Sequence, residues 1–174
     1  MKRLDWLIVC VAVIAGLSGC LQRGEFPDEP YLEYLSFERQ EGLTEMRFRF
    51  TDGDGNVGLD NRDTMPPFNA TNNPINLNHW NLWWKYYFKQ DGEWIVLSAE
   101  NDPPLYLDPN ASFFRIPRLD PQGQNKALEG EIVVDMTNWF PLTNHDTVKY
   151  GFILLDRDLN RSNEAQSPEL YPNQ

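Results

Sequence analysis

Residues 44–51 read Thr44-Glu45-Met46-Arg47-Phe48-Arg49-Phe50-Thr51. Met46, Phe48 and Phe50 fall on one side of an extended chain, because successive side chains of a strand point to opposite faces. The two arginines between them fall on the other side. The alternation predicts a half-buried β-strand with an apolar face toward a core and a charged face toward solvent.

A hairpin signal occurs later in the chain. Gln90-Asp91-Gly92 separates two runs rich in aromatic and β-branched residues, and Asp-Gly between such runs is typical of a tight hairpin turn. The register that this turn sets places Phe88 opposite Ile95, Tyr86 opposite Leu97 and Trp84 opposite Ala99.

Strand signals of this kind dominate the sequence, and no stretch combines helical periodicity with caps. About seven short strands with turn residues between them favour an antiparallel β-sandwich of immunoglobulin-like type. A small β-barrel is the alternative. The strands are expected at residues 31–37, 44–51, 80–89, 93–99, 112–116, 129–136 and 147–155, with a shorter strand after Arg161.

The N-terminal residues have the layout of an export signal. Lys2 and Arg3 precede an uncharged apolar run over residues 6–16, which is shorter than the roughly 20 residues that a membrane-spanning helix needs. Leu17-Ser18-Gly19-Cys20 then looks like the lipobox of bacterial lipoproteins. An ordinary secretory signal, with Cys20 incidental, is the alternative. The predicted organisation is a signal peptide over 1–19, lipidated Cys20 and a tether over 20–30, and one β-sandwich domain over 31–174.

Charge and cysteine content narrow the function classes. The net charge of −11 disfavours nucleic acid, because phosphate backbones require a basic surface, and anionic lipid head groups would also repel the domain. Cys10 would leave with the signal and Cys20 would carry lipid, so no disulfide is expected. The expected location is the cell envelope, at the outer membrane, with the membrane bound through the lipid.

Residues 52–63 form an acidic loop in which alternate positions carry side-chain oxygens. Alternate Asp and Asn with intervening glycines can curl around calcium, which takes six to eight oxygen ligands. The loop departs from an EF-hand, which has glycine where Val57 stands. Turn chemistry alone is the alternative, since tight turns need the same residues. The candidate calcium ligands are Asp52, Asp54, Asn56 and Asp60, with Asp63 as a further candidate.

A second acidic loop covers residues 156–163 and repeats the alternate spacing with two arginines added. The arginines argue against a second ion. In an immunoglobulin-like order, the loop after the second strand and the loop before the last lie at the same end of the sandwich. The two loops are therefore expected to share one site or one salt-bridge network.

The aromatic hairpin offers a second candidate site. One face of it presents Trp83, Tyr87 and Trp94 together with lysines, and exposed rings can stack on a sugar or anchor a protein partner. The alternative is that the long Asn-rich loop or the lysine stems cover these rings. A glycan or another envelope protein is the partner class that this face would suit.

The sequence offers little for catalysis. It has two histidines, His79 and His145, no free thiol in the mature part, and none of the common nucleophile, zinc or phosphate-loop motifs. A non-enzymatic binding or structural module is therefore predicted. The alternatives are a glycan-binding accessory lipoprotein and, from another class, a carboxylate-based hydrolase.

Several segments together resemble a group of uncharacterised lipoproteins of Bacteroidota. They are the DGDGxxG loop at residues 52–58, residues 63–68, the Asp91-Gly92 turn, residues 127–132, and the DRxxNxSN-like segment at 156–163. The order of these segments is comparable across nearly the whole mature chain. The resemblance implies an envelope location and this fold, and supplies no reaction. Asn56 stands where that group often has another acid, which weakens the case for an ion.

Overall fold

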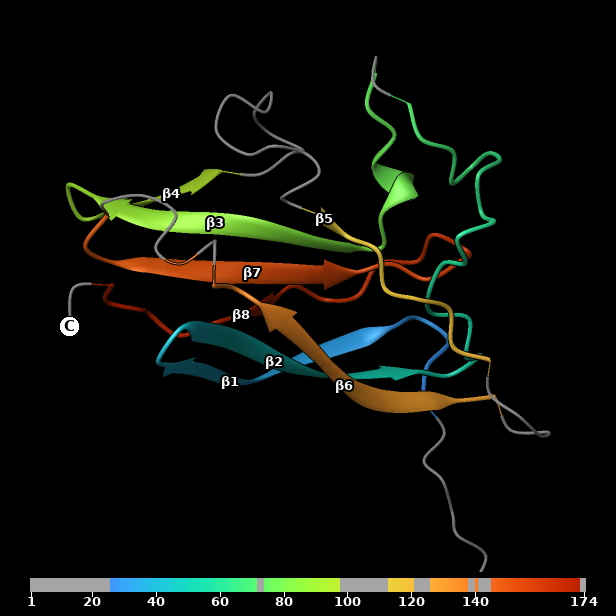
Figure 1. The fold of residues 1–174 in the computed structure, drawn as a ribbon, viewed down its shortest axis with the longest axis horizontal. Coiled ribbons are helices and arrows are strands. Elements are labelled where there is room, and N and C mark those ends of the chain that lie inside the picture. Colours follow the sequence, from blue (N-terminus) through green and yellow to red (C-terminus); the bar gives the residue numbers. More distant parts are fainter. Residues whose placement is uncertain are drawn as a thin grey trace, which may run out of the picture.

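The computed structural model describes residues 26–71, 74–97, 113–120, 126–137, 140 and 145–172. These residues form two antiparallel sheets that pack face to face, seen as two layers in Figure 1. The first sheet has the order β1-β2-β6, formed by Tyr31–Gln40, Leu43–Asp52 and Leu128–Asp135. The second has the order β4-β3-β7-β8, formed by Glu93–Leu97, Leu82–Gln90, Val148–Leu154 and Ala165–Gln166, and β5 (Phe113–Phe114) pairs with the start of β3.

The strand order is that of an immunoglobulin-like sandwich. In one sheet β1, β2 and β6 take the places of strands A, B and E, and in the other β4, β3, β7 and β8 take those of C′, C, F and G. Every strand pairing is antiparallel, and the two sheets do not close into a barrel. The predicted antiparallel sandwich is confirmed, and the barrel alternative is wrong.

Aromatic side chains fill the space between the sheets. Phe48 of β2 and Phe152 of β7 are fully buried, and their ring centroids lie 4.7 Å apart across the sandwich. Met46 and Phe50 are buried beside Phe48, as the alternation predicts, while the intervening arginines pair with glutamates of β1 and β6 on the outer face. Because burial of each such ring contributes about 2 to 3 kcal/mol, this layer is a main source of stability.

Within the described residues, the main core begins some way into the chain. The buried members of the main core cluster lie between Leu32 and Leu170. A chain that begins at Leu21 therefore contains every described residue of the main core, and we expect it to fold.

A side chain, instead of a strand, occupies the outer edge of β1. Asn163 accepts a hydrogen bond from Leu32 N at 2.9 Å and donates through Nδ2 to Leu32 O at 2.8 Å. At the other end of the strand, Arg39 donates to Pro172 O at 3.3 Å. The C-terminal segment thus satisfies both backbone groups of Leu32, which an open edge would expose, and contacts the far end of β1 through Arg39.

The predicted hairpin register is confirmed where it can be compared. Phe88 pairs with Ile95 and Tyr86 with Leu97, whereas the pairing of Trp84 with Ala99 involves a position outside the described residues. The strand expected at 112–116 is shorter, because only two of its residues pair with β3. The strand expected after Arg161 is β8.

The N-terminal predictions fall mostly outside the described residues. These are the signal peptide over 1–19, lipidated Cys20 and the tether as far as residue 25. Within the described ranges the helical structure is one 3₁₀ turn, η1 (Leu77–His79), and no helix there is long and apolar enough to cross a membrane.

Candidate binding site at the loop end of the sandwich

The two acidic loops follow strands of different sheets and meet at one end of the sandwich. Val57, just after β2, forms an antiparallel bridge with Asp156, just after β7. The prediction that both loops lie at the same end is confirmed. This end of the molecule, formed by residues 52–63 and 156–163, is called the loop end.

The two loops repeat one turn design. Both have the pattern Asp-x-Asp-x-Asn, at residues 52–56 and 156–160. In each, the first carboxylate accepts a hydrogen bond of 2.8 Å from the backbone amide of the asparagine. The residue before the asparagine has a positive φ, 70° at Gly55 and 67° at Leu159. Glycine adopts this conformation freely and leucine does so rarely, so the second loop carries more backbone strain.

Hydrogen bonds and an ion pair join the side chains of the two loops. Asn56 donates through Nδ2 to Asp54 at 2.8 Å and to Asp158 at 3.0 Å. Arg157 holds the Asp63 carboxylate with both terminal nitrogens, at 2.5 and 3.0 Å. A bidentate pair of this kind fixes orientation as well as distance. The salt-bridge network expected between the loops is therefore present.

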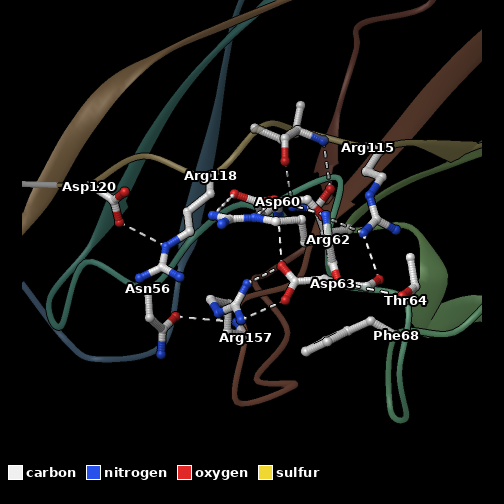
Figure 2. Close-up of polar contacts among 12 residues, drawn as sticks. Asn56, Asp60, Arg62, Asp63, Thr64, Phe68, Arg115, Arg118, Asp120 and Arg157 are labelled. Carbon is white, nitrogen blue, oxygen red and sulfur yellow. Dashed lines mark hydrogen bonds and ion pairs between the residues drawn. The ribbon is translucent and has the colours of Figure 1, made fainter.

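Arg115 ties further segments to this network. It donates to the backbone carbonyl oxygens of His79 at 2.6 Å, Asp60 at 2.8 Å and Asp63 at 3.0 Å. Figure 2 shows Asp63 between Arg115 on one side and Arg157 on the other. Sequence reasoning missed Arg115, because its partners lie 36, 55 and 52 positions away and no local pattern signals them.

Arg115→Ala is expected to lower the free energy of unfolding by about 3 kcal/mol, because three partly buried carbonyl groups lose a charged donor. Urea unfolding of both proteins measures this. Arg118→Ala is the matched control, since that exposed side chain pairs with Asp120 at 2.8 Å and should contribute below about 1 kcal/mol. Equal losses of unfolding free energy in the two variants would contradict the view that Arg115 stabilises the fold by joining these segments.

The carboxylates of the loop end fall into two electrostatic classes. Hydrogen bonds from Arg62 lower the pKa of Asp60 to about 2, and those from Arg157 lower the pKa of Asp63 to about 2. Burial raises the pKa of Asp52 to about 6, with the neighbouring charge of Asp54 as the second cause. Asp52 is 0% exposed, and among the described residues its Oδ1 has no hydrogen-bonding partner of good geometry.

These contacts bear on the candidate calcium ligands. The carboxylates of Asp60 and Asp63 are bound by arginines. Those of Asp52 and Asp54 accept hydrogen bonds from the backbone amide of Asn56. In the part of the chain that the structure describes, no three His, Cys, Asp or Glu side chains gather closely enough to hold a metal ion. The five candidates thus lie in one region without converging on one point.

Calcium binding by this loop stays a prediction. Thermal unfolding in millimolar calcium and in excess chelator tests it, since saturation to about 100 times the dissociation constant should add roughly 2.7 kcal/mol. A rise in Tm that disappears in Asp52→Ala/Asp54→Ala would support an ion at this loop. Equal Tm values in calcium and in chelator would contradict calcium binding.

A polar pocket of about 270 Å³ opens between the two loops and the segments on either side of residues 121–125. Its lining brings charges of both signs within one small volume. Such a site suits a small ligand that carries opposite charges itself, because each charged group finds its complement. The charged lining consists of Arg118, Lys126 and Arg157 and of Asp54, Asp120 and Asp158.

Trp83, predicted to be an exposed ring of the hairpin, is buried. Its side chain is 4% exposed, and its indole nitrogen donates to Leu77 O at 3.2 Å and Trp80 O at 3.1 Å. The guanidinium of Arg161 lies 4.7 Å from the ring centroid. Trp83 is therefore wrong as part of an exposed stacking surface, because the Asn-rich segment before β3 covers it, as the alternative interpretation held.

Tyr87 and Trp94 are half-buried on the same outer face, with lysines over their rings. Lys149 Nζ lies 5.0 Å from the Tyr87 centroid and 4.7 Å from the Trp94 centroid, and Lys89 Nζ lies 5.5 Å from Trp94. The Tyr87 hydroxyl donates to Glu164 at 2.5 Å. Glycan binding through this face stays a prediction, tested by a glycan array with Trp94→Ala.

Comparisons with known proteins supply no family. The resemblance to lipoproteins of Bacteroidota therefore stays a prediction. No protein-family model, no curated protein and no solved structure matches this chain.

Proposed function

We propose that this chain is a lipoprotein of the bacterial cell envelope, anchored at the outer membrane through lipid on Cys20. Its β-sandwich is a non-enzymatic module that binds a small charged ligand at the loop end. The anchor rests on the basic segment, apolar run and lipobox of residues 1–20.

The observation that carries the binding role is the construction of the pocket. Two loops from different sheets are joined by Asn56 and by the pair of Arg157 with Asp63, and Arg115 fixes that pair from a third segment. Pre-ordered side chains lose little conformational entropy on binding. A small charged pocket on an ordered loop framework is thus suited to recognition, and loops on a rigid sandwich are a usual place for it.

Anchoring is tested in bacterial cells fed an alkyne-bearing fatty acid. We expect the full chain to take up the label and to sediment with membranes, and Cys20→Ser to lose both properties completely. Cys10→Ser is the matched control, because that residue lies in the signal and should leave labelling unchanged. Label retained by Cys20→Ser would contradict the anchor.

A further inference from the structure

The chain enters the fold at the loop end. β1 starts at Tyr31, which pairs with Thr51 at the end of β2, so the first described residues lie beside the first acidic loop. Gly53 N donates to Pro27 O at 2.7 Å, and a Cβ on Gly53 would collide with the backbone oxygen of Phe26. The approach is so close that only glycine fits there.

This entry point limits how far the loop end can stand from a membrane. If lipid is attached at Cys20, as the proposed function holds, six residue steps separate it from Phe26. Six steps span at most about 20 Å of extended chain. The Asp91-Gly92 turn lies a strand length further on, roughly 30 Å for β3. The pocket therefore belongs to the membrane-proximal end of the domain.

The pocket carries complementary charges for a dipolar group. Lys126 and Arg118, the latter paired with Asp120 at 2.8 Å, offer cations on the segments that flank residues 121–125, and Asp54 and Asp158 offer carboxylates on the two acidic loops. Lys126 forms no ion pair with another described residue, and Asp54 and Asp158 have the neutral amide of Asn56 between them. Among the described residues the lining holds no aromatic side chain, so a neutral sugar would find no ring to stack on.

We propose that this pocket binds a zwitterion in which a phosphate ester is linked to an ammonium group, as in the head group of a zwitterionic phospholipid. Arg118 and Lys126 contact the phosphate, and Asp54 and Asp158 accept hydrogen bonds from the ammonium. The proposal rests on the lipid anchor for the source of the ligand, and on the pocket alone for its chemistry. A chain of net charge −11 is repelled by anionic surfaces but not by zwitterionic ones.

The chemistry is tested in solution with the chain that begins at Leu21, which contains every described residue of the main core. Amide NMR spectra are recorded during titration with O-phosphorylethanolamine, inorganic phosphate and ethanolamine. We expect saturable shifts at Gly55, Asn56 and Asp158 with the zwitterion, and affinities weaker by about tenfold or more for either half alone. Absence of saturable shifts would overturn the proposal.

Pocket variants locate the binding. Lys126→Ala and Asp158→Ala are each expected to weaken binding of the zwitterion by about tenfold. Both should leave Tm nearly unchanged, because both side chains are exposed. Lys89→Ala and Glu41→Ala remove matched charges at the opposite end of the sandwich and should leave affinity unchanged. Equal weakening in all four variants would overturn a pocket site, since it would reflect net charge only.

The source of the zwitterion is tested with the lipidated mature chain in vesicles of phosphatidylethanolamine and phosphatidylcholine. The mature sequence has no cysteine apart from Cys20, so a fluorophore can be placed uniquely by Asn61→Cys at the loop end or by Glu93→Cys, an exposed position beside the hairpin turn, at the far end. Nitroxide lipids should quench the fluorophore at the loop end strongly and the one at the far end little. Lys126→Ala should reduce quenching at the loop end.

The outcomes separate the two proposals. Binding in solution without preferential quenching at the loop end would overturn the proposal that the ligand is a lipid head group. A soluble zwitterion would then be the ligand. Intact binding in solution without fatty-acid label on Cys20 would contradict the proposed lipid anchor and leave the pocket site standing. Quenching at the loop end without binding in solution would keep the anchor and remove the pocket site.

Discussion

Gly58→Ala is expected to lower the free energy of unfolding by about 4 kcal/mol and the Tm by about 10 °C. Gly58 has a φ of 101°, which side-chain-bearing residues rarely adopt. A Cβ there would collide with Pro117 O and lie 2.5 Å from Arg118 Cα, both of them backbone atoms that cannot rotate away. The variant should therefore also displace Arg118 and weaken the pocket.

Gly42→Ala separates the cost of a side chain at positive φ from the cost of the steric collision. Gly42 has a φ of 78°, and a Cβ on it would meet nothing within 4 Å, so its loss should be only about 1 kcal/mol. Urea unfolding of the three proteins gives the comparison. If the two alanine variants lost equal stability, the tight contact between Gly58 and residues 117–118 would have no energetic weight.

Asp52→Asn is expected to stabilise the protein at pH 7, by up to about 3 kcal/mol. The folded chain buries this carboxyl completely and raises its pKa from 3.8 to about 6. Between about pH 4 and pH 6 the folded state thus binds more protons than the unfolded state, and the stability contributed by Asp52 falls as pH rises. Asparagine keeps an oxygen for the Asn56 amide and carries no charge.

The pH dependence of the difference identifies this cause. Unfolding free energies of wild type and Asp52→Asn should agree near pH 4 and diverge up to pH 7. Asp60 and Asp63, whose pKa values are lowered, withdraw stability as pH falls from about 4 toward 2, but they do so equally in both proteins. Asp91→Asn, at the exposed hairpin turn, is the control. A difference between wild type and Asp52→Asn that did not change with pH would contradict the explanation.

Local patterns in the sequence were sufficient for the long strands. Met46, Phe48 and Phe50 alternate with arginines, and their burial follows from that period alone. Asp91-Gly92 likewise sets the register of its hairpin, because a two-residue turn leaves little freedom in pairing. Even the meeting of the two acidic loops follows from an immunoglobulin-like order of strands.

Contacts between distant segments could not be predicted in this way. Trp83 sits on the outer side of β3, where alternation predicts exposure, yet η1 and Phe113 cover it from elsewhere in the chain. Arg115 and Lys126 carry no motif. The contacts of Arg115 and the place of Lys126 in the pocket lining arise only when the sandwich brings separate loops together. The pocket is therefore a property of the tertiary structure, although the acids on its walls were visible in the sequence.

The contact of Asn163 with Leu32 has a consequence for a crowded surface. If the chain is anchored through lipid, as proposed, its copies are confined to two dimensions and share one orientation, so identical strand edges would meet far more often than in solution. An open β1 edge would offer its backbone groups to the same strand of a neighbour, the first step toward an intermolecular sheet. By occupying both groups of Leu32, Asn163 keeps neighbouring copies from joining there.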